Sequence, residues 1–390
     1  MKYMWCNPFN RNIKKKAKVA WSVAISLLIA VVVMVFSDVE IPISSDKTQL
    51  QWFNKLAPQC ESAQDRAFMR DSMLFIDVHY DKVMALKMAS DTIPDGYEPI
   101  TDRLLLKEFL DSLNSRKNYK YIVLDVFFEK SIRQNGDTAL FNLIASMDNI
   151  VIPYPGEGEL ADNRLKNKAG VAMYGTTFLE SDFVKYPYFL KGEKSMASKM
   201  YEDLTKRKIK SYGFLHFDKL LVRNSAILTF RLPNNKQYVS RLSVVLGKDS
   251  IHNNTISMFE SYEDYTKDKY ILIGDFEDDR HATYQGTMTG TMINFNAYLS
   301  MMDGHHRYSI VAFIVLWGVL FWFTYRILER TYESSWFIFQ YPFWLGFICF
   351  VLYRFNEVYD VLLASLLLYV LKVSVDLYDN KDKIIKKLNE

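Results

Sequence analysis

The pattern of apolar and polar positions divides the chain into four hydrophobic segments and one long polar stretch. The apolar segments are residues 19–36, 308–325, 336–353 and 358–375. Each is long enough, at about 1.5 Å rise per residue, to cross the apolar core of a bilayer. We therefore expect four transmembrane helices, one near the N-terminus and three near the C-terminus, with an extramembrane domain at residues 37–307.

Basic residues set the expected orientation of these helices. Residues 1–18 carry six lysines and arginines and no acidic residue. Because such residues are retained on the cytoplasmic side, residues 1–18 and the tail 376–390 are predicted inside and the domain outside. The alternative for the first segment is a cleaved signal peptide, but Val35-Phe36-Ser37-Asp38 lacks the paired small residues of a cleavage site.

Within the domain, short apolar runs alternate with helical patterns. The runs predict strands at residues 73–78, 121–128, 149–154 and 270–274. Apolar residues spaced three or four apart predict helices at 103–114, 138–147 and 290–302. Continuous apolar strands joined by helices are typical of an α/β domain with a mostly parallel sheet covered on both faces.

The rest of the domain has a weaker pattern. Residues 156–210 show no sustained periodicity, so we expect long loops and short helices there. An apolar stretch at residues 226–232 and a helix around residues 240–246 are expected after it.

Composition narrows the functional classes. The net charge of +3 is close to neutral, and the basic excess falls on the predicted cytoplasmic flanks, so no nucleic-acid partner is expected. Cys6, Cys60 and Cys349 fall in three different compartments of this topology, which excludes a disulfide between them and a thiolate metal site. We expect neither a metal nor a cofactor.

Aspartates follow three of the predicted strands. Asp77, Asp125 and Asp275 each stand near the carboxyl end of an apolar strand, the edge where open α/β sheets bind ligands. If the strands are neighbours, these carboxylates converge with the loop residues Asp278, Asp279, Arg280 and His281. The group could bind a cation or a polar ligand. The alternative is structural, with the carboxylates accepting backbone N–H groups of loops.

Two glycines precede the last predicted helix. Gly286 and Gly290 flank a short segment that could cradle an anion at the helix N-terminus. A tight turn with positive φ explains them equally well.

Several motifs together resemble a known family. They are FIDVHYD at 75–81, YIVLDVFFE at 121–129, GDTALFNLI at 136–144, the set Gly213, Asp218, Val222 and Arg223, and the segment from YILIGD to SMMDG at 270–304. In these motifs the chain resembles the class-two CHASE domain, the extracytoplasmic sensory domain associated with bacterial cyclases and histidine kinases. The order of one span before the domain and three after it is also similar. Lys219, Leu220 and Leu221 depart from the family pattern, which favours an acidic residue and a glycine before the Val-Arg pair.

The resemblance implies a sensory protein of the bacterial inner membrane with a periplasmic domain. Family members usually continue into a cytoplasmic output module, whereas this chain stops shortly after residue 375. We therefore expect no enzymatic activity of its own, and signalling to a separate membrane or cytoplasmic partner. The bilayer and further copies of the chain are the other expected partners. Two alternatives remain: a scaffold or assembly factor of a membrane complex, and an extracytoplasmic enzyme that uses the aspartates with His281.

Overall fold

The computed structural model contains two compact units, each described by itself. The helical unit comprises residues up to Pro58, residues 177–180 and the chain from Arg307, and the α/β unit comprises Gln59–Thr176 and Ser181–His306. The described residues are 8–9, 14–37, 46–56, 62–90, 93–154, 159–172, 185–190, 192–213, 215–228, 230–233, 238–248, 257–261, 264–331, 337–353 and 357–389.

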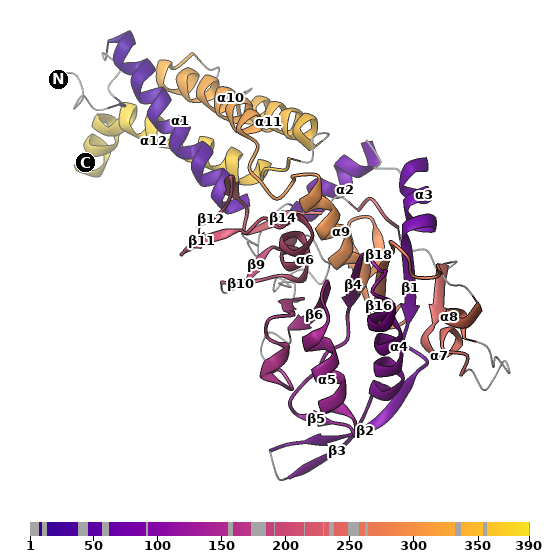
Figure 1. Ribbon diagram of the computed structural model, residues 1–390. Coiled ribbons are helices and arrows are strands. Elements are labelled where there is room, and N and C mark those ends of the chain that lie inside the picture. Colours follow the sequence, from indigo (N-terminus) through magenta and orange to yellow (C-terminus); the bar gives the residue numbers. More distant parts are fainter. Residues whose placement is uncertain are drawn as a thin grey trace. The chain divides into compact units, whose positions relative to one another are not determined.

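A six-stranded sheet forms the centre of the α/β unit (Figure 1). Its strands, in spatial order, are β15 (Val239–Arg241), β1 (Met73–Asp77), β16 (Tyr270–Gly274), β4 (Tyr121–Leu124), β6 (Ile150–Tyr154) and β7 (Ala169–Val171). All neighbouring pairs are parallel. The expected mostly parallel sheet is therefore confirmed, and the run at 270–274 is a central strand.

The four inner strands, β1, β16, β4 and β6, are almost wholly apolar because helices cover both faces of the sheet. One face packs on α4 (Arg103–Arg116), α5 (Asp137–Ser146), α7 (Leu242–Val245) and α8 (Met258–Ser261). The other face packs on α3 (Ala63–Ser72), α6 (Met196–Thr205) and α9 (Gly290–Met302). Because side chains alternate along a strand, Ile76, Leu124 and Ile273 face α4 and α5, while Tyr270 contacts Phe295 of α9.

A buried arginine joins the starts of α4 and α5. Asp102 caps α4 by accepting the N–H groups of Leu104 and Leu105. The next residue, Arg103, pairs with Asp137 in the first turn of α5 at 2.6 Å. Its guanidinium also lies over the rings of Phe128 and Phe141. The two helices therefore share one buried polar anchor.

A hairpin that the sequence pattern does not predict lies between β1 and α4. β2 (Lys82–Met88) pairs with β3 (Pro94–Thr101) on one side and with β5 (Ile132–Arg133) on the other, both antiparallel. The hairpin projects from the rest of this unit (Figure 1). β3 is one of the two edge strands of this small sheet and contains Pro94 and Pro99. Its charged and polar residues hide the alternation that would mark a strand.

Smaller elements complete the α/β unit. They are η1 (Asn163–Leu165) and the pairs or triplets β8 (Lys185–Pro187) with β14 (Ser225–Ile227), β9 (Phe189–Leu190) with β10 (Glu193–Lys194), β11 (Lys210–Tyr212) with β12 (Leu215–Asp218) and β13 (Leu220–Val222), and β17 (Arg280–Thr283) with β18 (Gly286–Thr289).

Some expected boundaries differ from the observed ones. β4 ends at Leu124 instead of residue 128, and the stretch 226–232 contributes only the end of β14, outside the main sheet. The region 156–210, expected as loops and short helices, also supplies β7 and the ten-residue helix α6. α9 has the predicted bounds, Gly290–Met302.

The helical unit contains α1 (Lys15–Ser37), α2 (Asp46–Leu56), α10 (Ile310–Glu329), α11 (Phe337–Tyr353) and α12 (Val361–Asn389). Among the residues described, α1, α10 and the segment Val361–Lys381 are long and apolar enough to cross a membrane. α11 is apolar but shorter, with Pro342 inside it. The structure thus supports three of the four predicted spans, and the span at 336–353 stays a prediction.

Contacts between these helices define two ends of the unit. α1 buries three serines and an alanine together with Ile29 and Val33, and the Trp317 indole of α10 donates to Ser26 Oγ at 3.1 Å. At one end, the Asp360 N–H before α12 donates to Ser37 Oγ, the last residue of α1. At the other, Arg330 after α10 pairs with Asp379 of α12 at 2.8 Å. Cys349 is buried in α11 as a free thiol, and Cys6 and Cys60 lie outside the described residues.

Candidate ligand-binding site

Three neighbouring strands bring the predicted aspartates to one edge of the sheet. β16 pairs with β1 on one side and β4 on the other, and Asp77 lies opposite Gly274 in the register. Asp275 and Asp125 come directly after the last residues of β16 and β4. All three residues therefore lie at the carboxyl edge, as the sequence predicts for neighbouring strands.

Asp77 is buried and ties two loops together. One of its carboxylate oxygens accepts the N–H groups of His79 at 3.0 Å and Phe276 at 3.2 Å. Burial raises its pKa above the usual range, although both backbone hydrogen bonds lower it. For Asp77 the geometry favours the structural role, because its carboxylate holds the loops that leave β1 and β16.

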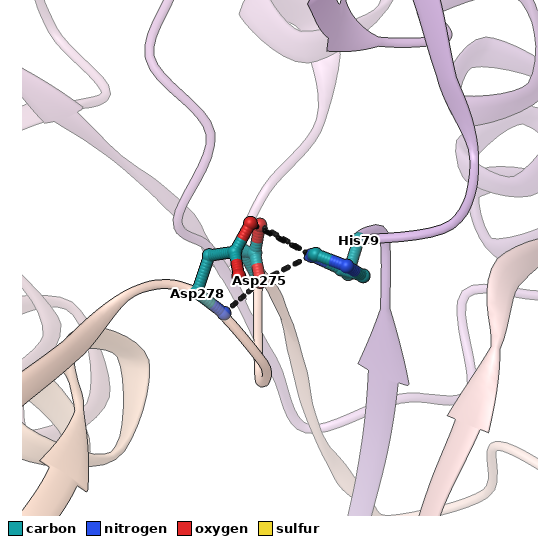
Figure 2. Close-up of side chains that lie close together, drawn as sticks. All are labelled: His79, Asp275 and Asp278. Carbon is teal, nitrogen blue, oxygen red and sulfur yellow. Dashed lines mark hydrogen bonds and ion pairs between the residues drawn. The ribbon is translucent and has the colours of Figure 1, made fainter.

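Asp275 and Asp278 converge on a histidine from the other loop, as Figure 2 shows. His79 Nδ1 lies 3.2 Å from Asp275 and 3.3 Å from Asp278. Lys82 Nζ, at the start of β2, lies 2.9 Å from Asp275 and 3.7 Å from Asp278. Two carboxylates, an imidazole and an ammonium thus meet in one group, which we call the His79 cluster.

The surroundings of Asp275 keep it ionised. Burial alone would raise its pKa, but hydrogen bonds from the Asp278 N–H, the Lys82 ammonium and His79 outweigh burial and lower the pKa to about 2. The Glu277 N–H donates to the same carboxylate at 3.0 Å. Asp275 is therefore a fixed negative charge at neutral pH. Asp278 is 70% exposed and is the accessible acid of the cluster.

The His79 cluster has the composition of a metal site, but it already contains a cation. Ligand atoms of His79, Asp275 and Asp278 all lie within 4.8 Å of one another. An imidazole with two carboxylates suits a divalent transition metal. The Lys82 ammonium, however, lies in contact with Asp275 and supplies the positive charge that a metal would bring. The arrangement therefore favours an internal ion pair.

Asp125 forms a separate group at the start of α9. Its carboxylate accepts from Thr291 Oγ1 at 3.0 Å and from Asn294 Nδ2 at 3.4 Å. Asn294 accepts in turn from the Tyr186 hydroxyl at 2.8 Å. The lack of a side chain at Gly274 makes this contact feasible, since a Cβ there would lie 2.1 Å from Thr291 Oγ1.

The pKa of Asp125 is raised into the neutral range. Burial is the main cause of the raised pKa, and the charge of Asp279 adds to it. Hydrogen bonds from Thr291 and Asn294 lower the pKa, as does the His281 charge. The resulting pKa of Asp125 is about 7. A carboxyl group with this pKa changes its charge near physiological pH. Asp125 therefore differs from Asp275, which stays ionised.

The remaining predicted residues belong to the β17–β18 hairpin and its approach. His281 Nε2 lies 2.8 Å from Asp279, and Arg280 pairs with Glu277 at 2.9 Å. The Asp279 carbonyl accepts the Gly290 N–H at 3.1 Å, which fixes the hairpin to the start of α9. Gly286 has φ +112° in the hairpin turn, so for this glycine the tight-turn explanation is confirmed.

Sequence reasoning missed four contributors: His79, Lys82, Thr291 and Asn294. His79 stands two residues after Asp77, so its place just beyond a strand end was a usable signal. Nothing in the sequence marks Lys82 as a site residue, because its contact with Asp275 depends on the β2–β3 hairpin, which the apolar pattern does not predict. The two α9 residues become visible only when β4 and β16 are known to be neighbours.

A second polar cluster lies within the α/β unit, away from the sheet edge. The Tyr201 hydroxyl donates to buried Asp218 at 2.6 Å, and His306 Nε2 lies 3.3 Å from the same carboxylate. Asp218 belongs to the quoted family motif, and the next residue, Lys219, has φ +60° in the turn between β12 and β13. The departure from the family pattern thus falls on a turn that glycine would adopt with less strain.

Two hollows flank the Lys130–Glu159 ion pair, the smaller beside the end of β2 and β5 and the larger beside the carboxyl end of β6. Their volumes are about 270 and 360 Å³, and Tyr154 lines the larger one. The paired charges lie between them at 2.5 Å. Sequence reasoning named none of these residues.

The raised pKa of Asp125 generates a pH prediction. A carboxyl group whose pKa is higher in the folded chain stabilises the fold fully below about pH 4 and loses this contribution as the pH rises to about 7. Asp125→Asn keeps an acceptor oxygen and cannot ionise. We expect it to raise the free energy of unfolding at pH 8 by on the order of 1–3 kcal/mol, with a smaller gain at pH 5.

The measurement is thermal unfolding of the full chain in detergent between pH 5 and 8. Asp95→Asn, on the exposed part of β3, is the matched control and should not alter the pH profile. A destabilisation by Asp125→Asn of equal size at every pH would contradict the assignment.

The internal ion pair of the His79 cluster generates a second prediction. We expect Mn²⁺ to leave the melting temperature of the wild type unchanged and to raise that of Lys82→Met by a few degrees, because removing the ammonium leaves the Asp275 and Asp278 carboxylates without the cation that contacts both. Differential scanning fluorimetry with and without Mn²⁺ checks this. The double variant Lys82→Met with Asp278→Asn should lose the response; an equal response in the wild type would show that Lys82 does not exclude the ion.

Comparison with known proteins places this geometry in a family. The profile of the CHASE2 domain matches residues 47–328. No curated protein matches the chain, and neither does any solved structure. The matched region is more than half of the sequence and covers the α/β unit with its aspartate edge, as the motif resemblance predicts. The chain therefore belongs to the CHASE2 domain family.

Proposed function

We propose that this chain is a sensory protein of a bacterial inner membrane, which binds a ligand or partner in the periplasm and signals to a separate protein. The extent of the family match carries the proposal. The match begins in α2, covers the α/β unit and ends at residue 328, next to the last residue of α10. Domain and candidate membrane helix thus belong to one family unit.

The distribution of charge in the helical unit supports the orientation. The end with Arg330 and Asp379 also contains the start of α1 with Lys15, Lys16 and Lys18. Basic residues at helix ends are retained in the cytoplasm. We therefore assign this end to the cytoplasm and the end with Ser37 and Asp360 to the periplasm, with α11 as the fourth span.

The charges at the sheet edge indicate the class of ligand. Asp278 offers an accessible carboxylate beside the ionised Asp275, and Asp279 lies beyond it in the same loop. Lys82 and Arg280 balance only part of this negative charge. A cationic ligand such as an amine would pair with the exposed Asp278 carboxylate and leave the Lys82–Asp275 ion pair in place. The proposal assigns binding to this edge and no catalysis.

α9 is the element through which we expect the signal to leave the site. Its first turns contact Asp125 through Thr291 and Asn294. It ends at Met302, and the chain then enters α10 at Ile310. A ligand that favours one arrangement of α9 would thereby bias α10, provided that it binds the two arrangements with different affinity.

The orientation can be tested with single cysteines in a variant that lacks the native ones. Tyr97→Cys in β3, which is 70% exposed, should react with a membrane-impermeant maleimide in intact spheroplasts. Asn380→Cys in α12 should react only after lysis. The reverse pattern would place the α/β unit in the cytoplasm and overturn the sensory proposal.

Sensing is tested with the full chain in nanodiscs and with putrescine and spermidine as amine probes. We expect at least one of them to raise the melting temperature and to change the distance between spin labels at Leu28→Cys on α1 and Ile314→Cys on α10. Both sites are more than half exposed on the surface of the helices. Asp278→Asn should raise the amine concentration needed for half of the response at least tenfold, because it removes the accessible charge.

Asp95→Asn, in the hairpin, is the matched control and should keep the response. A chain that responds to neither amine, and whose label distance stays fixed, would favour the scaffold alternative. Affinity purification from native membranes should then recover a stoichiometric complex that no stimulus alters.

A further inference from the structure

The short helix α2 packs on the end of the helical unit that contains Ser37 and Asp360, which we assign to the periplasm. Gln49 Nε2 donates to the Tyr359 carbonyl at 3.0 Å, and the Val361 N–H donates to Gln49 Oε1 at 3.3 Å. The Phe53 ring lies 5.4 Å from that of Tyr353, the last residue of α11. α2 is thus seated where α11 ends and α12 begins.

Two apolar residues of α2 lie outside its buried side. Gln49, Leu50 and Phe53 are buried, whereas Trp52 is 61% exposed and Leu56 is 67% exposed. Trp52 and Leu56 are four residues apart, so they share one side of the helix, beside the buried side. Gln51 and Lys55 are exposed and lie further round the helix.

This distribution of residues is typical of a helix that lies in the plane of a membrane interface. Such helices present aromatic and aliphatic residues to the acyl boundary and polar residues to water. Tryptophan favours this depth because its ring is apolar while its N–H needs a polar partner. Lys55 Nζ lies 5.7 Å from the centre of the Trp52 ring, where an ammonium can reach the headgroups.

We propose that the Trp52–Leu56 side of α2 is a lipid-binding surface, inserted at the headgroup boundary of the outer leaflet. Continuity carries the choice of lipid as the occupant. α2 packs on the ends of α11 and α12, whose flanking surfaces expose the apolar residues Phe347, Val351 and Leu362. The exposed side of α2 adds two further apolar residues at the end of the helical unit where α11 ends and α12 begins. The inference rests on the proposed membrane placement.

The test uses the full chain in nanodiscs of phosphatidylcholine and phosphatidylglycerol, with single nitroxide labels in a cysteine-free variant. The measured quantity is the ratio of each label's collision rate with oxygen to its collision rate with a water-soluble nickel chelate. This ratio should be higher for labels at Trp52→Cys and Leu56→Cys than for labels at Gln51→Cys and Lys55→Cys. We expect the ratio to differ at least threefold. The second apolar position keeps the test decisive if Trp52→Cys does not fold.

A label at Leu28→Cys in the middle of α1, where Leu28 is 65% exposed, separates the two proposals. If Leu28 is in lipid while both apolar positions of α2 have the nickel accessibility of Gln51, the lipid-binding surface is overturned and the membrane placement stands. Because the nanodisc contains a single purified chain, a surface meant for another protein would give this same result. If Leu28 itself is in water, the membrane placement fails.

Discussion

The pairing of β16 between β1 and β4 is the constraint on which the rest of the α/β unit depends. This strand begins at Tyr270, far along the chain from Met73 and Tyr121, yet it pairs with both neighbours in parallel. It brings the loop after Gly274 between the loops that follow β1 and β4. Without this strand, the Asp275 carboxylate would not reach His79, and the Thr291 hydroxyl of α9 would not reach Asp125.

The pleat of the sheet divides the predicted site into two groups with different chemistry. Asp275 lies with His79 and Lys82, where hydrogen bonds keep its pKa at about 2. Asp125 lies on the α9 side, where burial raises its pKa to about 7. The first group contains the permanent charge of Asp275 beside the exposed Asp278, and Asp125 in the second group changes charge within the physiological range. A ligand at the first group and a proton at the second would thus act on the same edge.

The sequence predicts those parts of the fold whose signal is local. Continuous apolar runs identify β1, β6 and β16, because these strands are buried on both faces, and the spacing of the apolar residues Met292, Phe295, Leu299 and Met302 identifies α9. The β2–β3 hairpin was missed because its strands are half exposed and rich in charge. The aspartates could be named from their positions after strands, but Lys82 and Thr291 could not, since their contacts depend on strand order.

The composition of β3 has a consequence for how copies of this chain can associate. An edge strand invites a strand of another molecule, and the resulting addition can continue into fibres. Pro94 and Pro99 each lack an N–H group, and Asp95 and Glu98 would repel the same residues of a second copy. The exposed edge of β3 is therefore a poor template for strand addition by a second copy of this chain.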